Sequence, residues 1–246
     1  MAITCIAFDL DGTLYPDFSL RVHLASFTLR NASFLVAFGL ARAEIHARAA
    51  AGSGSADDGG CADEAWPRDL AGYRELQAAL AARRWGRSAE EAFGRAEESV
   101  YGELEGYFAQ VRLFDGVEDC LAELAAREFR LGLLSDFPPR RKLAFLGIAD
   151  RFQAIRCSEE SGTLKPARKP FFDLAADLGV APEEILYVGN SLRYDVAGAK
   201  AAGMRAALKV PRIGRRPGRR PAGGHAGPDI IFSDYADLPD LVASLV

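Results

Sequence analysis

Two aspartates stand directly after a short apolar run near the start of the chain. The run is Ile3–Phe8, and Asp9 and Asp11 follow it just before Gly12. An apolar strand that ends in two carboxylates is costly unless those groups face a cation, hydrogen-bond donors or solvent. Two such groups could share a divalent ion, with one acting as a nucleophile and the other as a proton donor to a leaving group. Capping of the following turn would explain one aspartate, but it explains the pair less well.

Four more residues with reactive or ligating side chains come later in the chain. Ser135 closes one apolar run, and Asn190 follows another, with Asp195 near the start of the helical stretch after it. Lys165 stands before a proline between these two places. Taken alone, the serine would be a turn residue, the lysine a solvated side chain, and the aspartate a favourable partner for the helix dipole. A functional role for these residues therefore depends on the whole ordered set.

The elements that must position these residues are short apolar runs of strand length. Four of them are rich in aliphatic side chains, and the first three end in polar or glycine-containing turns: Ile3–Phe8, Arg130–Ser135, Glu184–Gly189 and Arg205–Val210. Helical patterns fall between them. Near-continuous apolar strands that alternate with helices indicate a parallel sheet covered on both faces, so the predicted fold class is α/β, doubly wound and Rossmann-like. In such sheets ligands lie beyond the carboxyl ends of the strands, where the polar residues above are found.

The long segment between the first and second apolar runs contains helical patterns and no convincing strand. The predicted helices are Val22–Arg48, Leu70–Arg84 and Ser88–Tyr107, and the small, polar segment Ala49–Glu64 is expected to be a flexible loop. The third helix opens with Ser88 and Glu91 in the spacing of a capping box. We therefore expect a core formed by residues 1–15 and 113–246 and a mainly α-helical cap domain formed by residues 16–112.

Composition narrows the class of protein and its partners. The 246 residues can bury a large core, and the formal net charge of −4 gives no overall reason to expect a nucleic acid or a membrane surface as partner. The apolar stretch Phe27–Leu40 is broken by Arg30 and Asn31 and fails as a membrane span. The first apolar run is too short for a secretory signal peptide, so we expect a cytoplasmic protein. The cysteines form no CxxC pair and are expected to be small buried hydrophobes.

The segment 211–228 is dense in arginine, glycine and proline, which predicts a loop after the fourth apolar run. Its arginines could attract an anionic substrate or partner, or the segment could be a solvated, mobile loop, and both interpretations stay open. Arg21, His23 and Arg30 in the expected cap are further candidates for contact with a substrate. Charged helix positions usually face solvent, which favours a surface role for these three.

Four segments together resemble the motifs of the haloacid dehalogenase superfamily, most of whose members are phosphatases. FDLDGTLY resembles the first motif, and RLGLLSD, which contains Ser135, resembles the second. GTLKPARKPFF, which contains Lys165, resembles the third, and VGNSLRYDVAGAKAAGM resembles the fourth, usually G-D-x-x-x-x-D. The four segments occur in the family's order and at expected strand ends. The resemblance covers essentially the whole chain, including a helical insertion placed as in members with a cap after the first motif.

The resemblance implies a two-step displacement at phosphorus. Asp9 would attack the phosphorus in line and form an aspartyl-phosphate, which divides one difficult displacement into two easier ones. Asp11 would protonate the departing alkoxide and then deprotonate the water that hydrolyses the intermediate. The hydroxyl of Ser135 and the ammonium of Lys165 would stabilise charge on the phosphoryl oxygens.

The same resemblance implies Mg²⁺ as the cofactor. Its protein ligands would be the side chain of Asp9, the backbone carbonyl of Asp11 and the fourth-motif residues Asn190 and Asp195, in keeping with the preference of magnesium for oxygen ligands. Asn190 stands where the family usually has aspartate, so the site has one negative charge fewer, which could weaken metal affinity or turnover. An asparagine in this region is also a feature of the dehalogenase branch, which uses no metal.

Asp11 separates the two branches. A halide leaving group needs no proton, and dehalogenases of this superfamily lack the second aspartate, whereas an alkoxide needs a proton. We therefore expect a magnesium-dependent phosphohydrolase that acts on a small phosphorylated metabolite. A phosphomutase, a 2-haloacid dehalogenase and a weakly active regulatory or interaction protein remain alternatives. Asp136, where asparagine is common, is a second departure from the family pattern, and the sequence leaves the physiological substrate and the oligomeric state open.

Overall fold

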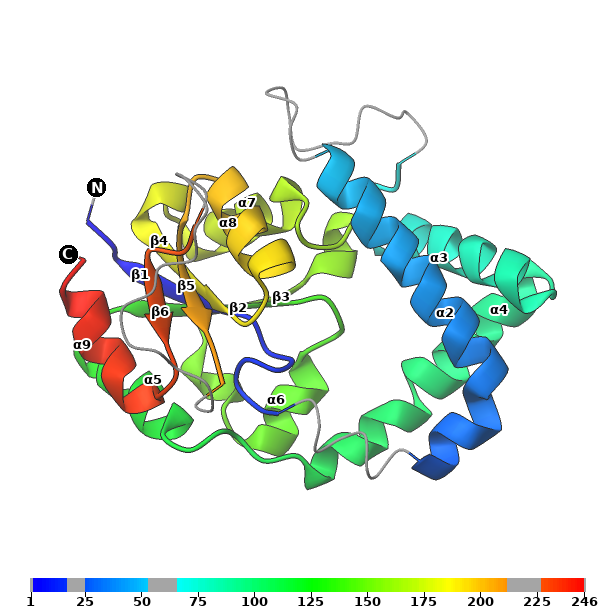
Figure 1. Cartoon of the computed structure of the whole chain (residues 1–246), viewed down its shortest axis with the longest axis horizontal. Coiled ribbons are helices and arrows are strands. Elements are labelled where there is room, and N and C mark those ends of the chain that lie inside the picture. Colours follow the sequence, from blue (N-terminus) through cyan, green and yellow to red (C-terminus); the bar gives the residue numbers. More distant parts are fainter. Residues whose placement is uncertain (1, 17–24, 53–65, 212–226, 246) are drawn as a thin grey trace.

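The computed structural model describes residues 2–16, 25–52, 66–211 and 227–245 of the chain. The centre of the described part is a parallel sheet with the strand order β3-β2-β1-β4-β5-β6 (Figure 1). The strands are β1 (Cys5–Phe8), β2 (Arg130–Ser135), β3 (Ala154–Cys157), β4 (Ile185–Gly189), β5 (Arg205–Lys209) and β6 (Ile230–Phe232). Because β1 lies between β2 and β4, the segments that follow these three strands are neighbours in space.

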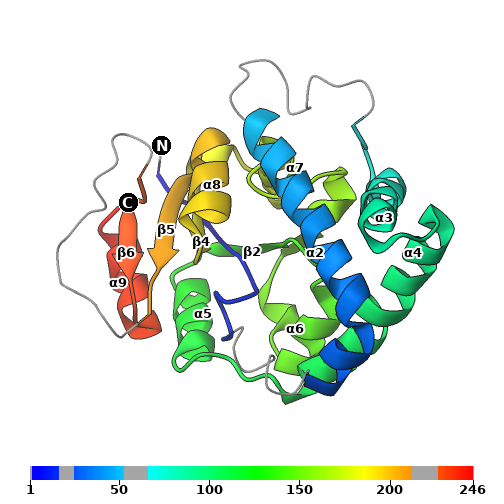
Figure 2. The same ribbon diagram turned by 45° about the vertical axis from the view of Figure 1, so that its right-hand side comes forward.

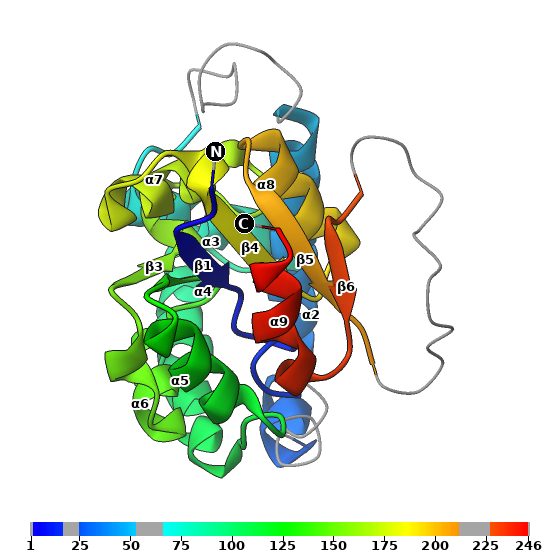
Figure 3. The ribbon, with the colours of Figure 1, turned by 90° about the vertical axis from the view of Figure 1, so that its left-hand side faces the viewer.

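Helices cover both faces of the sheet (Figure 3). On one face lie α5 (Val117–Ala126), α6 (Arg140–Leu146) and α9 (Leu238–Ala243), and on the other lie α7 (Arg168–Leu178) and α8 (Ala197–Ala201). Along β1, Ile6 and Phe8 join the first hydrophobic cluster, whereas Cys5 and Ala7 join the second. Successive side chains of a strand point to opposite faces, so a strand covered on both sides must be apolar throughout. The predicted doubly wound α/β class is confirmed.

The four predicted strands are present, and two more were missed. β2 has the predicted bounds, and the other three are shorter than predicted by one or two residues. The missed strands, β3 and β6, form the two edges of the sheet. In β3 the apolar pattern is interrupted by Arg156, whose Nε donates to Oδ2 of Asp177 in α7 at 2.7 Å. β6 has only three residues, too few to show a period.

Between β1 and β2 the described chain is helical and lies beside the sheet (Figures 1 and 2). Its elements are α2 (Ala25–Gly52), α3 (Leu70–Trp85), α4 (Ala89–Arg95), the π-helical turn η1 (Ala96–Val100) and the 3₁₀ helix η2 (Glu103–Gln110). Of these elements, α2, α3, α4 and η1 share a hydrophobic cluster that includes Phe34, Phe38 and Tyr73. Phe108, near the end of η2, instead joins a cluster of the sheet. The division of the chain at residues 16 and 112 therefore stays a prediction.

The third predicted helix begins as expected but does not continue as one helix. Ser88 Oγ accepts from the backbone N–H of Glu91 at 3.1 Å, and Oε2 of Glu91 accepts from the N–H of Ser88 at 2.9 Å, so the capping box is confirmed. The single helix Ser88–Tyr107 is wrong, because the chain passes from α4 into η1 and then turns at Gly102. A Cβ at Gly102 would lie 2.7 Å from the carbonyl oxygen of Glu98, so the turn needs glycine.

Helix α2 runs to Gly52, beyond the predicted end at Arg48. The alanines after Arg48 continue the helix because alanine has the highest helix propensity. The first part of the predicted loop Ala49–Glu64 is therefore helical, and its remainder lies outside the described residues, as do residues 22–24 of the predicted helix.

Short helical turns complete the described part of the chain. They are η3 (Ala149–Arg151), η4 (Ser158–Ser161), η5 (Pro182–Glu184), η6 (Leu192–Val196) and η7 (Tyr235–Asp237). Cys5, Cys120 and Cys157 are buried free thiols, as predicted, and Cys61 lies outside the described residues. Most of the arginine-rich segment, residues 212–226, also lies outside them. Across the described ranges, no helix has the length and apolar character needed to span a membrane.

Candidate active site

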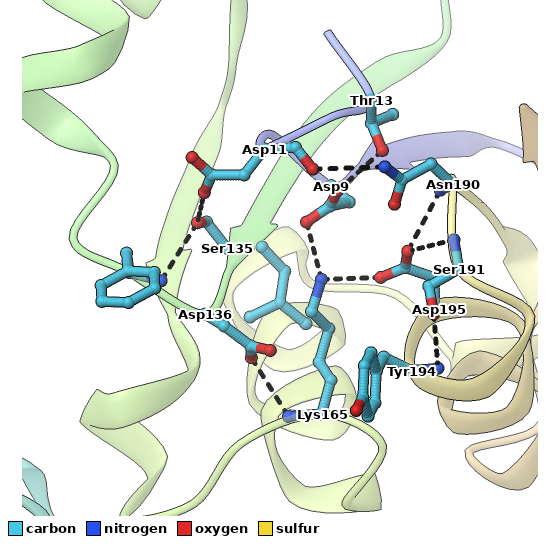
Figure 4. A network of polar contacts seen from close by, with 12 residues as sticks. Asp9, Asp11, Thr13, Ser135, Asp136, Lys165, Asn190, Ser191, Tyr194 and Asp195 are labelled. Atoms are coloured by element: carbon cyan, nitrogen blue, oxygen red, sulfur yellow. Dashed lines mark hydrogen bonds and ion pairs between the residues drawn. The ribbon is translucent and has the colours of Figure 1, made fainter. Parts of the chain in front are cut away.

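The polar residues predicted from the sequence meet at one edge of the sheet (Figure 4). Asp9 directly follows β1, Ser135 ends β2 and Asn190 follows β4. The carboxyl ends of parallel strands lie on the same side of a sheet, so these residues become neighbours although they are far apart in sequence. Lys165 comes from the segment between η4 and α7, and Asp195 comes from η6.

Asp9 lies at the centre of this group and is only 5% exposed. Its Oδ1 accepts from Nζ of Lys165 at 2.7 Å, and its Oδ2 accepts from Oγ1 of Thr13, also at 2.7 Å. Burial raises the pKa of Asp9 to about 7, against the opposing effect of the Lys165 ammonium. Both hydrogen bonds fix the orientation of the carboxylate. Thr13, the threonine of the DxDGT segment, was not among the predicted site residues.

Lys165 is buried and bridges two carboxylates. Its Nζ lies 2.7 Å from Oδ1 of Asp9, 2.7 Å from Oδ1 of Asp195 and 3.3 Å from the hydroxyl of Tyr187. Burial alone would lower the pKa of Lys165, but Asp195 and Asp9 together raise it well above its usual value. The ammonium therefore stays charged and compensates the two carboxylates. Tyr187, a residue of β4 that donates to the carbonyl of Leu134, is a site residue that the apolar strand pattern concealed.

Asp195 organises the loop that follows β4. Its Oδ2 accepts from the backbone N–H groups of Asn190 and Ser191 at 3.1 and 2.9 Å, while its Oδ1 faces Lys165. A Cβ at Gly189 would lie 2.4 Å from Cβ of Asp195, so the loop can close on the carboxylate only because this residue is glycine. Both oxygens of Asp195 are thus engaged by the protein.

The carboxylate of Asp11 points to the opposite side of the site from Lys165 (Figure 4). Its Oδ2 accepts from Oγ of Ser135 at 2.9 Å, and its Oδ1 accepts from Nζ of Lys142 at 2.6 Å and from the hydroxyl of Tyr15. Burial by itself would raise the pKa of Asp11, but Lys142 and the hydrogen bonds lower it below its usual value. Asp11 is therefore ionised in this arrangement, and it accepts the hydrogen bond that the hydroxyl of Ser135 donates.

Lys142 is a basic site residue that was not predicted. It lies in α6, is 4% exposed, and places its ammonium 4.5 Å from the ring centroid of Phe108 and 5.4 Å from that of Phe137. In the sequence it follows two other basic residues, Arg140 and Arg141, and nothing in that run marks one of the three as buried. Only the docking of α6 beside the end of β1 brings it to Asp11.

The predicted metal ligands supply oxygen donors of the kind that Mg²⁺ prefers. Nδ2 of Asn190 lies 3.5 Å from the backbone carbonyl of Asp11, next to Asp9 in Figure 4. The nitrogen and oxygen of an amide exchange places by rotation of the group, so Asn190 can present an oxygen at the same position. Within the described ranges, no three His, Cys, Asp or Glu side chains gather as a ligand set. A hard cation held by one carboxylate, one carbonyl and one amide oxygen fits the residues present.

Of the three residues named from the sequence as candidates for contact with a substrate, one lies in the described part of the chain. Arg30 is largely exposed on α2 and pairs with Glu103 of η2. Arg21 and His23 lie outside the described residues. A residue of α2 that does reach the site is His46, whose Nδ1 lies 2.6 Å from the carbonyl oxygen of Lys165. Its position on the helix carries no motif, so only the packing of α2 reveals it.

The sequence of the chain matches those of known proteins. A sequence model of the haloacid dehalogenase-like hydrolase family matches residues 3–203. The chain is 30% identical to glyceraldehyde 3-phosphate phosphatase of Methanopyrus kandleri, with 99% of this chain and 98% of that protein covered. It is 32% identical to phosphoglycolate phosphatase of Salmonella choleraesuis, with 95% and 90% covered.

The fold of the chain also resembles that of a solved structure. It resembles L-2-haloacid dehalogenase from Xanthobacter autotrophicus with a TM-score of 0.65 at 20% identity, over 99% of this chain and all of that one. At that identity the likeness concerns the fold, whereas the sequence match extends along most of the chain. The predicted resemblance is confirmed: the chain belongs to the haloacid dehalogenase-like hydrolase family.

Proposed function

We propose that this protein is a magnesium-dependent phosphatase that hydrolyses small phosphate monoesters through an aspartyl-phosphate on Asp9. The observation that carries the proposal is the pair of carboxylates after β1, one bound to Lys165 and the other to Ser135 and Lys142. Family membership and the phosphatase relatives support the class of reaction. A small phosphorylated metabolite is the substrate class that we infer from them.

The two carboxylates divide the chemistry. Asp9, buried and held by Thr13 and Lys165, would attack the phosphorus, and the bond between phosphorus and the ester oxygen would break. The departing alkoxide needs a proton, which the protonated carboxyl of Asp11 would donate. In the second step the ionised Asp11 would take a proton from the attacking water, which regenerates Asp9 and releases phosphate. Lys165 would stabilise negative charge on the phosphoryl oxygens throughout.

A bound magnesium ion would be held by the side chain of Asp9, the carbonyl oxygen of Asp11 and the amide oxygen of Asn190. It would supply positive charge against the phosphate and the nucleophile. We propose that Asp195, predicted as a fourth ligand, acts instead by holding Lys165 and the backbone of the loop after β4. Its oxygens accept from Lys165 and from two backbone N–H groups, whereas the contacts of Asp9 among the described residues are one donor on each oxygen.

The test compares phosphate release from an aryl phosphate with and without Mg²⁺. We expect release only with the metal, and loss of activity in Asp9→Asn, which keeps the shape of the side chain but removes the nucleophile. Asp150→Asn, at an exposed position of η3, is the matched control and should behave as the unmodified protein. Activity that survives both chelation and Asp9→Asn would sink the proposal.

A 2-haloacid dehalogenase is the second candidate, and Asn190 is the observation that favours it. Halide release from chloroacetate without added metal would support that activity. Asp11 argues against it, because departure of a halide requires no acid.

A further inference from the structure

One residue of the cap helix α2, His46, contacts the backbone of the lysine that binds Asp9. The Nδ1 atom of His46 lies 2.6 Å from the carbonyl oxygen of Lys165. A carbonyl oxygen can only accept, so Nδ1 carries the hydrogen in this contact. The imidazole also packs against the ring of Tyr194, with the ring centroids 4.5 Å apart. His46 is mostly buried, with 15% of its side chain exposed.

Asp136 contacts both the backbone N–H of Lys165 and the ring of His46. Its Oδ1 accepts from the backbone N–H of Lys165 at 3.1 Å, and its Oδ2 lies 3.8 Å from Nε2 of His46. The N–H and the C=O of Lys165 are thus both bound, the first by the loop after β2 and the second by the cap. From this fixed backbone the side chain extends to Asp9 and Asp195, each 2.7 Å from Nζ.

Arg42 docks α2 on the same loop one helical turn before His46. Its Nη2 donates to the carbonyl of Asp136 at 2.6 Å, and its guanidinium lies 3.8 Å from the ring centroid of Phe137. Its Nη1 pairs with Glu159 of η4 at 2.6 Å, and both side chains are buried. Residues four apart lie on one face of a helix, so α2 contacts the core here with Arg42 and His46 together.

We propose that His46 is a positioning residue for Lys165, so that the catalytic lysine is aligned only while α2 is docked on Asp136. The role given to Lys165 rests on the proposed function. A lysine that stabilises charge in the transition state must be placed closely, and a displacement of about 1 Å can cost on the order of a hundredfold in rate. If α2 moves away, the carbonyl of Lys165 loses its contact with His46, and one of the two backbone contacts that hold the lysine in place is gone.

Two substitutions separate positioning from bulk packing. In His46→Asn the amide nitrogen stands near the place of Nδ1 and can still donate to the carbonyl of Lys165. In His46→Gln the amide nitrogen stands nearer the place of Nε2, and that donor is lost. We expect kcat for an aryl phosphate to fall about tenfold or more in His46→Gln, with KM nearly unchanged, and to be largely retained in His46→Asn. Arg48→Gln, on the exposed side of α2, is the control and should leave both constants unchanged.

Equal kcat values in all three proteins would overturn the proposal. So would equal losses in the Asn and Gln variants that follow their losses of thermal stability, because that pattern belongs to a packing role. Affinity for inorganic phosphate, measured by calorimetry, adds a readout that does not require turnover, and it should fall in His46→Gln but not in His46→Asn. That binding pattern in a protein that hydrolyses no ester would contradict the proposed function and support the assignment of His46. Absence of both phosphate binding and turnover in the unmodified protein would contradict both.

Discussion

Asp11 and Lys142 show how one carboxylate can be held for two tasks. The ion pair, together with the hydroxyls of Ser135 and Tyr15, favours the ionised form of Asp11. That form suits the second step, in which a base is needed, whereas the first step needs the protonated acid near the leaving oxygen. In the proposed mechanism, Lys142 would therefore keep the carboxyl of Asp11 in place between the two steps.

Substitution of Lys142 should affect poor leaving groups most. In Lys142→Gln the pKa of Asp11 should rise, which favours its protonated form, but the carboxyl also loses the partner that fixes its position. We expect the loss of position to dominate, so that Asp11 donates its proton to the leaving oxygen less efficiently. A general acid contributes about a hundredfold or more, and an alkyl phosphate depends on it more than a nitrophenyl phosphate does. We expect kcat/KM to fall more for the alkyl ester, by about tenfold beyond the fall for the aryl ester.

The neighbouring exposed Arg141→Gln variant serves as the control for the charge change on α6. Equal losses for the two esters in Lys142→Gln would show that Lys142 does not act through Asp11.

Some of these residues could be found from the sequence and others could not. Asp9, Ser135 and Asn190 each follow or end a strand, so one rule about strand ends brings them together. Lys142 and His46 lie within helices, where basic residues are common and usually face solvent. Only the packing of α6 and α2 on the core separates them from other residues of their type.

At the scale of elements, we expect the contact between α2 and the core to depend on the protonation of His46. Burial lowers the pKa of His46 below its usual value, and the nearby charges of Arg42 and Lys165 act in the same direction, while Asp136 and the carbonyl of Lys165 oppose it. The ring of Tyr194 covers its face. The unfolded chain therefore binds a proton to this residue more readily than the folded protein does.

The sign of the pH effect follows from this difference. Because the folded pKa is depressed, the neutral imidazole's contribution to the free energy of unfolding is present above about pH 6.5, and it is lost as the pH falls from there towards the folded pKa. Between about pH 8 and pH 5.5, the unmodified protein should lose more stability than His46→Asn, which has no titrating group at this position. Urea unfolding at both pH values measures the difference. A difference between the two proteins that does not change with pH would contradict this account.

Element boundaries were predictable where a local signal marks them. The capping box at Ser88 fixed the start of α4, and the continuous apolar run fixed β2. The edge strand β3 was missed because Arg156 interrupts its pattern, and the bend at Gly102 was missed because it depends on the close approach of the Glu98 carbonyl. Helix propensity and strand period describe local preference, whereas these features come from contacts between elements.

At the scale of the whole molecule, the candidate active site lies where the helices between β1 and β2 contact the loops at the edge of the sheet. The sheet places the carboxylates of Asp9 and Asp11, and the helical insertion supplies His46 and Arg42 from the other side. Buried Glu159 accepts from both Arg42 and Arg74. An ion pair out of water is favourable only when its charges are well matched, so separation of the helical insertion from the sheet would disturb this group and the backbone of Lys165 at once.

In the proposed mechanism, Asp9 carries the phosphoryl group during turnover. The direct measurement is mass spectrometry of the protein after rapid acid quench during hydrolysis of an aryl phosphate with Mg²⁺. We expect a phosphoryl group on the peptide that contains Asp9, at the position of that aspartate, and no such group in Asp9→Asn. Hydrolysis that proceeds with no phosphorylated aspartate at any quench time, or with the phosphoryl group on another residue, would contradict it.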